Sequence, residues 1–371
     1  MSKRHWMIAR VQIAGAWMWS AWQPDRGLAF NSYLFERDGG FVAVDPLPLD
    51  ESSVEEIARR GGVHTIVVTN RDHERDARAL RERFGARLMA SAAEANLLGI
   101  AVDATFHDRD EVFSGAYAVA LPHGKTAGEF ALHLPDARTA VVGDALIGAP
   151  AGALSLPPSE KLADRERFIL ALRRLWALQL HTLLLCDGQP VFGSADSAIA
   201  ALLFAEGGSA IHRINADEIE YRIPRPSPYA CDDGEIGLLI GARKLGYQLT
   251  RIPPGKVFCP LHWHVRAEEF FYVVEGHPKI RTLAGTIECR PGDFIAFPTG
   301  ESGAHQVLND GSEPALVLLV GMEEDAVEFE ACFYPDSDKV GMWTPQRRLR
   351  MLRASPDLNY YDGEPPSDIS L

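Results

Sequence analysis

Two stretches in the second half of the chain decide its fold: His262-Trp-His-Val-Arg-Ala-Glu-Glu-Phe-Phe-Tyr-Val-Val-Glu-Gly276 and Gly292-Asp-Phe-Ile-Ala-Phe-Pro-Thr-Gly-Glu-Ser-Gly-Ala-His-Gln-Val-Leu-Asn309. His262 and His264 lie two residues apart, so on a strand their side chains share one face. Glu269 follows in the same stretch, and His305 lies across a turn in the second. Three imidazole nitrogens and a carboxylate oxygen suit a divalent first-row metal ion. The sequence therefore predicts a metal site formed by these four side chains.

Short strand-like runs surround the two stretches. They cover residues 247–252, 270–274, 279–283, 294–297 and 315–320, and Gly and Pro punctuate them. Because no helix-length periodicity intervenes, we expect an antiparallel barrel or double-sheet roll. Residues 334–371 read as an irregular extension that wraps a domain or a neighbouring subunit.

The joint pattern resembles the two signature motifs of the cupin family over roughly residues 245–321. The residues that carry it are Gly255, His262, His264, Glu269, Gly276, Gly292, Pro298, Gly300, His305 and Asn309. The resemblance implies a small β-barrel with the metal inside, and its spacing selects Glu269 rather than Glu268 as the ligand.

Strand alternation predicts the lining of this site. If the four ligands point inward, so do Phe271, Val273, Val307 and Asn309, which makes the pocket largely apolar. We expect one divalent ion per chain, with iron favoured over manganese, nickel, copper and zinc. Lys279 and Arg281 share a strand face, which either binds an anionic substrate or is a solvated outer face.

The first half of the chain alternates strands with helices, including a long helix over about residues 159–180. Four segments, residues 31–45, 67–75, 121–128 and 141–146, resemble the metallo-β-lactamase fold in order and spacing. That family binds zinc or iron through an H-x-H-x-D-H motif, a later His, an Asp and a last His. The positions that match these ligands here are Asn70, Asp72, Glu74, Arg75, Lys125, Asp144 and Gln189.

Only Asp144 among these positions keeps the family's ligand type. The resemblance thus favours the fold and disfavours hydrolase chemistry, since no imidazole remains at the matched positions. We expect an ion network in which Asp72, Glu74 and Asp144 meet Arg75 and Lys125. His73 and His123 occupy neighbouring positions and leave a rearranged metal site as the alternative.

Composition bounds the remaining choices. A chain of 371 residues exceeds the usual single domain, so two domains are expected. The two resemblances imply a degenerate metallo-β-lactamase-like αββα sandwich over residues 1–210, a linker over 211–225, and a cupin domain with a C-terminal extension over 226–371. A net charge of -14 argues against nucleic acid or anionic lipid as a partner. Five widely spaced cysteines and no run long enough to span a membrane favour the cytoplasm. A homodimer is expected.

These features favour a metal-dependent enzyme whose chemistry lies in the second domain. A dioxygenase-like oxidoreductase acting on a small organic molecule comes first, and a metal-dependent isomerase or lyase is the nearest rival. A small-molecule-binding or sensory protein without turnover is the alternative from another class. In either case the first domain is expected to be a non-catalytic scaffold, dimer interface or lid.

Overall fold

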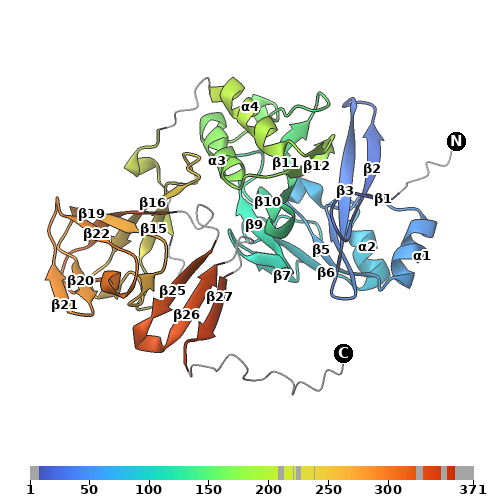
Figure 1. The fold of residues 1–371 in the computed structure, drawn as a ribbon. Coiled ribbons are helices and arrows are strands. Elements are labelled where there is room, and N and C mark those ends of the chain that lie inside the picture. Colours follow the sequence, from blue (N-terminus) through green and yellow to red (C-terminus); the bar gives the residue numbers. More distant parts are fainter. Residues whose placement is uncertain are drawn as a thin grey trace, which may run out of the picture. The chain divides into compact units, whose positions relative to one another are not determined.

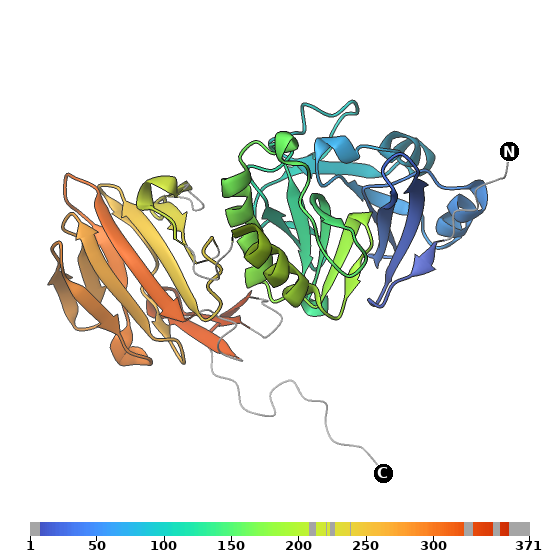
Figure 2. The same ribbon diagram turned by 90° about the horizontal axis from the view of Figure 1, so that it is seen from above.

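The computed structural model describes residues 8–207, 213–219, 221–222, 227–237, 239–322, 329–343 and 349–355. The chain divides into two compact units, Met1–His212 and Arg213–Leu371 (Figures 1 and 2). This division falls inside the predicted linker, of which residues 211–212, 220 and 223–225 lie outside the described part of the chain. No helix among the described residues is long and apolar enough to cross a membrane.

The first unit contains four α-helices and thirteen strands among its described residues. The strands are β1 (Ala9–Arg10), β2 (Ala16–Gln23), β3 (Leu28–Arg37), β4 (Gly40–Val44), β5 (Val63–Val67), β6 (Arg87–Ser91), β7 (Ala104–Phe106), β8 (Glu111–Phe113), β9 (Ala116–Ala120), β10 (Phe130–Leu134), β11 (Thr139–Gly148), β12 (Thr182–Gly188) and β13 (Val191–Phe192). The helices are α1 (Glu51–Arg59), α2 (Ala77–Phe84), α3 (Arg165–Ala177) and α4 (Ala195–Gly207), with 3-10 turns η1 (Arg71–His73), η2 (Pro135–Ala137) and η3 (Ser159–Lys161).

The strands form one sheet whose main path runs β7-β6-β5-β4-β3-β12-β11-β10-β9-β8. A single residue pair, Phe30 with Asp187, joins β3 to β12, so the sheet folds into two halves at this point. Alternate residues of a strand serve different cores: Val42 and Val44 of β4 pack between the halves, whereas Phe41 packs with α1 and α2.

The other half of the sheet repeats this arrangement. Leu184 of β12 joins the core between the halves, while Leu183 and Leu185 pack against α3 and α4. Both faces of each half are therefore buried, and the layers run helix, sheet, sheet, helix. This confirms the predicted αββα sandwich.

Helix α3 is shorter than the predicted helix over 159–180. It begins at Arg165 because the side chain of Asp164 accepts a hydrogen bond from the backbone N–H of Arg167 and caps it. The preceding residues form η3 instead.

The second unit is almost entirely β-structure in its described residues. Its strands are β14 (Tyr221–Arg222), β15 (Asp232–Glu235), β16 (Leu245–Ile252), β17 (Lys256–Val257), β18 (Trp263–His264), β19 (Glu269–Glu275), β20 (Lys279–Thr282), β21 (Gly285–Glu288), β22 (Phe294–Phe297), β23 (Gln306–Asn309), β24 (Ala315–Met322), β25 (Glu330–Tyr334), β26 (Lys339–Trp343) and β27 (Leu349–Arg353). Its 3-10 turns are η4 (Ala216–Glu218), η5 (Glu301–Gly303) and η7 (Pro335–Ser337).

Two antiparallel sheets of this unit enclose one apolar core. The six-stranded sheet, ordered β14-β15-β16-β24-β19-β22, contributes Phe271, Val273 and Val317 to it. The four-stranded sheet, ordered β17-β23-β20-β21, contributes Ile280 and Val307. The predicted double-sheet roll is present, with the predicted inward alternation of β19.

A third sheet, ordered β18-β25-β26-β27, departs from the expectation of an irregular tail. Residues after Tyr334 form β26 and β27, which pair antiparallel with their neighbours. Pairing of β26 with β25 and of β27 with β26 satisfies backbone groups that an irregular tail would leave to solvent. Residues 344–348 and 356–371 of the predicted extension lie outside the described part of the chain.

Candidate metal centre

Three of the four predicted ligands, the histidines, converge on one carboxylate oxygen of the fourth, Glu269, inside the second unit. Oε2 of Glu269 lies 3.1 Å from Nε2 of His305, 3.4 Å from Nε2 of His264 and 3.9 Å from Nε2 of His262. Strand β19 supplies the carboxylate, β18 and the residue before it supply two imidazoles, and the turn before β23 supplies the third. All three imidazoles therefore present the same nitrogen to the same point.

The backbone fixes the orientation of two of these rings. Nδ1 of His262 lies 2.9 Å from the carbonyl oxygen of Pro260, and Nδ1 of His305 lies 2.9 Å from that of Gly303. Because a carbonyl only accepts hydrogen bonds, each Nδ1 carries the proton and each Nε2 keeps its lone pair. This is the tautomer that an Nε2 metal ligand requires.

Backbone pairing holds His262 and His305 side by side. The N–H of His262 donates to the carbonyl of His305 at 3.1 Å, and the N–H of His305 donates back at 2.9 Å. Gly300 donates its N–H to the carbonyl of His264 at 2.7 Å, which fastens the turn before β23 to β18. The three imidazoles are thus linked through main-chain bonds, independently of their side chains.

Burial sets the protonation states. Burial and the neighbouring His305 lower the pKa of His262 to about 4, so this imidazole is neutral at neutral pH. Burial alone would raise the pKa of Glu269, but His264 and His305 outweigh it and hold that pKa well below its usual range. The centre therefore offers a carboxylate and a neutral imidazole as donors.

These donors fit a divalent metal ion. Oε2 of Glu269 and Nε2 of His305 are buried and, among the described residues, have no hydrogen-bond partner of acceptable geometry. Such unsatisfied buried groups are rare unless a water or ion completes them. Ligand atoms of His262, Glu269 and His305 all lie within 4.8 Å of one another, and His264 reaches the same carboxylate from β18.

Apolar side chains surround the centre, as predicted for Phe271 and Val307. The rings of Phe271 and His305 meet edge to face, with their centroids 5.5 Å apart. The ring of Phe297 stacks on that of His305, with a centroid distance of 3.7 Å. Val273 and Val307 lie in the same core. Phe297 was not predicted, although its position opposite Glu269 in the β19–β22 ladder follows once the strands are paired.

The assignment of Asn309 to the pocket is wrong. Its amide donates to the carbonyls of Ile252 and Glu313 at 2.8 Å each and accepts from the N–H of Gly311. A side chain whose amide is used by three backbone groups is fixed in the turn after β23. Asn309 therefore stabilises this turn instead of lining the centre.

Lys279 and Arg281 form ion pairs away from the centre. Nζ of Lys279 lies 2.9 Å from both Glu288 and Asp310, and Arg281 binds Asp336 through both of its terminal nitrogens. This matches the solvated-face reading. Glu268, set aside by spacing, is exposed.

Sequence reasoning missed three residues of β25 that contact the histidines. Sγ of Cys332 lies 3.0 Å from Nδ1 of His264, and Oε1 of Glu330 lies 3.7 Å from the same nitrogen. The rings of Tyr334 and His262 are nearly parallel, and their centroids lie 5.9 Å apart. Residues 329–334 are mostly apolar and aromatic, which suits a strand, but nothing in this run indicates which strand it pairs with.

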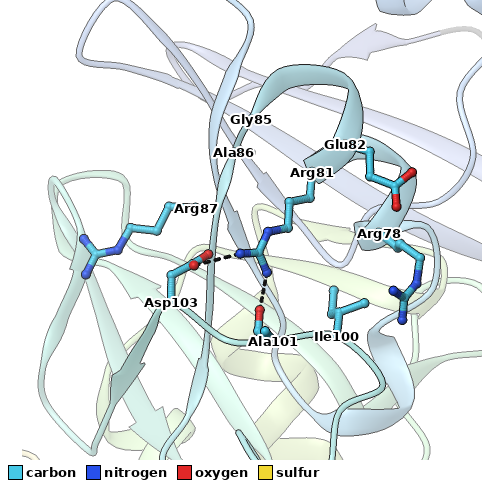
Figure 3. Close-up of a pocket in the computed structure, with 9 residues that line it drawn as sticks. All are labelled: Arg78, Arg81, Glu82, Gly85, Ala86, Arg87, Ile100, Ala101 and Asp103. Carbon is cyan, nitrogen blue, oxygen red and sulfur yellow. Dashed lines mark hydrogen bonds and ion pairs between the residues drawn. The ribbon is translucent and has the colours of Figure 1, made fainter.

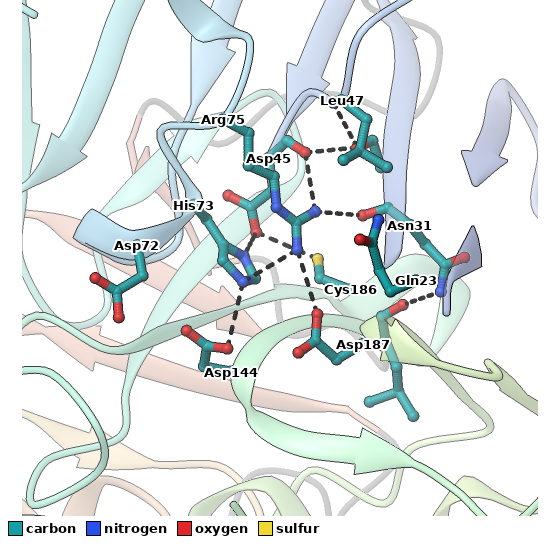
Figure 4. Close-up of polar contacts among 12 residues, drawn as sticks. Gln23, Asn31, Asp45, Leu47, Asp72, His73, Arg75, Asp144, Cys186 and Asp187 are labelled. Carbon is teal, nitrogen blue, oxygen red and sulfur yellow. Dashed lines mark hydrogen bonds and ion pairs between the residues drawn. The ribbon is translucent and has the colours of Figure 1, made fainter. Parts of the chain in front are cut away.

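The first unit contains a buried ion network at the positions matched to the lost ligands. Nζ of Lys125 lies 2.7 Å from Asp72 and 2.8 Å from Asp144. Arg75 lies 3.3 Å from Asp187 and also donates to the carbonyl of Asn31 (Figure 4). The predicted contact of Lys125 with Asp72 and Asp144 is present, whereas Arg75 pairs with a different aspartate.

His73 occupies the middle of this network. Its Nδ1 lies 2.8 Å from Asp45 and its Nε2 lies 3.5 Å from Asp144 (Figure 4). Burial and the adjacent Arg75 lower the pKa of His73, but Asp45 and Asp144 outweigh them and raise it to about 9. His73 is therefore an imidazolium at neutral pH.

Glu74 does not join the network, contrary to the prediction. Its carboxylate accepts the N–H of Gly99 and lies 4.0 Å from Arg78. The tight turn η1 and the left-handed backbone of Arg75, with φ 40°, direct His73 and Arg75 inward and Glu74 toward the start of α2.

Two further matched positions also differ from expectation. Gln189 is exposed, and Asp187, at the end of β12, provides the buried polar side chain in its place. Asn70 caps η1 by accepting the N–H of Asp72 and donates to Glu129 at 3.2 Å. Asn70 therefore has a structural role.

Two residue groups of the network have the spacing of metal ligands: Asp45, His73 and Cys186, and His73, Asp144 and Asp187. Both depend on His73, whose Nε2 lies 3.1 Å from Nη2 of Arg75. Burial raises the pKa of the Cys186 thiol well above its usual range, so this sulfur is protonated. A guanidinium at this nitrogen and a protonated thiol oppose cation binding, and the network fits ion pairing better than a metal.

A separate groove of the first unit lies between α2 and residues 100–103 (Figure 3). Arg78, Arg81 and Arg87 line it, but Arg81 is bonded to the carbonyl of Ala101 and to Asp103 at 2.8 Å. Arg78 donates to the carbonyl of Gly99. These arginines fasten the loop to the helix.

Comparisons with known proteins agree with the two folds. The family model of the metallo-beta-lactamase superfamily matches residues 10–204, and that of the cupin domain matches residues 248–321. A search of the curated proteins found no match.

Among solved structures, a putative sugar phosphate isomerase from Acidithiobacillus ferrooxidans is 24% identical, with 40% of this chain and 96% of that chain covered and a TM-score of 0.36. A cupin-superfamily sugar phosphate isomerase from Silicibacter pomeroyi is 28% identical, with 38% and 92% covered and a TM-score of 0.35. A metallo-beta-lactamase from Pontibacter korlensis is 17% identical, with 54% and 99% covered and a TM-score of 0.45.

The family assignment rests on the two model matches. The first covers more than half of the chain and coincides with the αββα sandwich. The second coincides with the double-sheet roll and contains His262, His264, Glu269 and His305. The chain belongs to the metallo-beta-lactamase superfamily and carries a cupin domain in its second half.

Proposed function

We propose that the protein is a metal-dependent cupin oxidoreductase of the dioxygenase type, acting on a small, largely apolar organic molecule. The observation that carries this proposal is the convergence of three imidazole Nε2 atoms on the buried Oε2 of Glu269. His262, His264, Glu269 and His305 would hold one divalent ion, for which iron is favoured. When bound, such an ion supplies Lewis-acid and redox chemistry at coordination positions that the protein leaves open.

The chain's own residues prepare the site. The carbonyls of Pro260 and Gly303 keep the proton on Nδ1 of His262 and His305, so that each Nε2 is free to bind. The carboxylate of Glu269 offsets positive charge in a buried setting. Phe271 and Phe297 exclude water around His305, which is 1% exposed.

The walls also limit the substrate class. Lys279 and Arg281 are engaged by carboxylates outside the core, so neither supplies a cation to the centre. Aromatic and aliphatic walls favour an apolar organic molecule over a phosphorylated one. This supports the oxidoreductase reading over chemistry that requires an anion clamp.

We propose further that the first unit takes no part in the reaction. Two of its former ligand positions are occupied by the cationic side chains of Arg75 and Lys125, paired with aspartates, and the neighbouring His73 lies between two carboxylates. Because its own cations already neutralise the carboxylates of this site, binding zinc would gain little electrostatic energy. A scaffold or interface role remains for this unit.

The test has two steps. Elemental analysis of the purified full chain is expected to give about one transition metal ion per chain, and His264→Ala and His305→Ala are expected to lose it. An oxygen electrode is then used with the iron-loaded protein and a panel of small aromatic and aliphatic compounds, with anaerobic samples as controls.

Oxygen uptake that depends on both iron and a compound supports the proposal. Conversion of a compound without oxygen uptake contradicts it and indicates an isomerase or lyase. Tight binding of a compound that is recovered unchanged contradicts it and indicates a binding or sensory protein. Full metal content in both histidine variants would show that the ligands are assigned wrongly.

A further inference from the structure

Strand β25 lies outside the segment that matches the cupin model, yet it packs directly on the metal centre. It pairs antiparallel with β18, with Cys332 opposite His264 and Phe333 opposite Trp263. The rings of Trp263 and Phe333 stack at 4.4 Å. Beyond β25, Arg281 of the barrel binds Asp336 through two nitrogens and ties the turn η7 to β20.

Glu330, at the start of β25, anchors the loop between two of the predicted ligands. Its buried carboxylate accepts hydrogen bonds from the backbone N–H groups of Val265 at 2.9 Å, Ala267 at 2.7 Å and Ala331 at 3.0 Å, and weaker ones from Arg266. An anion held by several backbone donors fixes the loop to which they belong. The loop joins His264 to Glu269, so Glu330 sets the separation of these two side chains.

Cys332 lies over the face of the His264 ring. Its Sγ lies 3.0 Å from Nδ1 and 3.6 Å from Nε2, and the Glu330 carboxylate lies 3.7 Å from Nδ1. The two sulfur distances are similar because the thiol packs on the ring face, out of line with the Nδ1–H, so Cys332 restrains the ring by contact. The nearby Glu330 carboxylate favours the proton on Nδ1, and with it the tautomer of His264 whose Nε2 lone pair faces Glu269.

We propose that β25 is a positioning strand of the metal centre, in which Glu330 fixes the loop from His264 to Glu269 and Cys332 orients His264. The inference rests on the proposed metal site. Contact with Cys332 restrains the His264 ring, whereas the carbonyls of Pro260 and Gly303 fix the rings of His262 and His305 through Nδ1. The carboxylate of Glu330 is already bonded to backbone amides, which suits orientation and not coordination.

Cobalt(II) titration of the metal-free full chain tests the role of Cys332. Cys332→Ala is expected to weaken cobalt affinity about 10- to 100-fold, as is typical for loss of a group that orients a ligand. Cys332→Ser is expected to recover part of the affinity, because the hydroxyl oxygen occupies most of the space of the sulfur against the ring face. Cys289→Ala, at another buried free cysteine of the second unit, is the matched control and is expected to bind as the unaltered chain does.

Hydrogen exchange tests the role of Glu330. Glu330→Gln replaces one carboxylate oxygen by an NH₂ group, so the amides of Val265, Arg266 and Ala267 are expected to exchange faster. Unchanged exchange at these amides would overturn the anchoring role. This measurement needs no metal and is read on the folded variant.

The outcomes separate this inference from the proposed function. Equal cobalt affinity of Cys332→Ala and the unaltered chain overturns the positioning role and leaves the metal site intact. A thiolate-to-cobalt charge-transfer band that both Cys332 variants lose also overturns it, because Cys332 would then be a ligand. Failure of the unaltered chain to bind cobalt overturns the metal centre itself.

Discussion

At the residue scale, the buried imidazole of His73 lies between two aspartates, 2.8 Å from Asp45 and 3.5 Å from Asp144. Asp45 is also held by the backbone N–H and the hydroxyl of Thr69, at 2.8 and 2.6 Å. Breaking a buried ion pair by removing one partner leaves the other charge uncompensated. The stability of the first unit therefore depends on the charge of His73.

Replacing His73 by Gln removes this charge and keeps a polar side chain of similar reach. We expect His73→Gln to lower the free energy of unfolding of the first unit by roughly 3–5 kcal/mol, since Asp45 and Asp144 stay buried without their cation. Urea denaturation followed by tryptophan fluorescence measures it. His107→Gln, at an exposed histidine, is the control, and equal stability of the two variants would contradict the prediction.

The pKa of His73 also predicts the pH dependence of stability. Folding raises this pKa from 6.5 to about 9, so protonated His73 stabilises the fold fully below pH 6.5 and this contribution is lost as the pH rises through 9. The loss amounts to roughly 3 kcal/mol. Urea midpoints across this range are expected to fall for the unaltered chain and to change less for His73→Gln; parallel curves would show that His73 does not titrate there.

At the element scale, the turn η5 places His305. Gly303 accepts from Nδ1 of His305, and a Cβ at Gly303 would lie 1.8 Å from the carbonyl oxygen of Pro298. The loop from Phe297 to His305 therefore closes on itself too tightly for any side chain at this position. The same close approach directs the His305 ring into the barrel.

Gly303→Ala is expected to displace this turn. The overpacking costs on the order of 1–3 kcal/mol of stability and moves His305 away from Glu269, so metal content falls as well. Thermal unfolding and elemental analysis measure the two effects. Gly207→Ala, where a Cβ meets nothing within 4 Å, is the control. A variant that keeps full metal content would show that η5 does not position the ligand.

At the scale of the whole molecule, the two units differ in how they balance buried carboxylates. The first unit pairs them with His73, Arg75 and Lys125, whereas the second leaves Oε2 of Glu269 facing imidazole nitrogens. Only the second arrangement gains from a divalent cation. The proposed metal site therefore predicts a single metal ion per chain.

Lys125→Ala tests this difference between the units. It is expected to leave the metal content of the chain unchanged, because Lys125 pairs with Asp72 and Asp144 in the first unit, whereas the proposed ligands all lie in the second. Elemental analysis beside the His305→Ala variant gives the comparison. Loss of metal from Lys125→Ala, or two ions in the unaltered chain, would contradict the assignment.

The oligomeric state stays a prediction. We expect a homodimer, and apolar side chains on the outside of the second unit favour it, with Phe294 74% exposed and Ile287 52% exposed. Light scattering during gel filtration is expected to give twice the chain mass, and Phe294→Asp is expected to lower it. The mass of a single chain at micromolar concentration would contradict the prediction.

The sequence by itself determined the fold of both halves and the four candidate ligands, which are Glu269 and the three histidines that face it. Spacing and alternation are local properties, so His262, His264 and Glu269 follow from strand geometry, and so do the inward Phe271 and Val273. The separation of motif residues along the chain also placed Lys125 with Asp72 and Asp144. It failed at Glu74 and Gln189, where a tight turn and an exposed loop replace the expected geometry.

Tertiary structure alone decided which distant groups complete each site. Pairing of β18 with β25 brings Glu330 and Cys332 to His264 across more than sixty residues of chain. The left-handed turn at Arg75 brings His73 between Asp45 and Asp144. Strand pairing and turn handedness depend on the packing of the whole domain, because local propensities leave several pairings open. The sequence therefore identifies the candidate ligands, but the tertiary structure sets the orientation of their side chains.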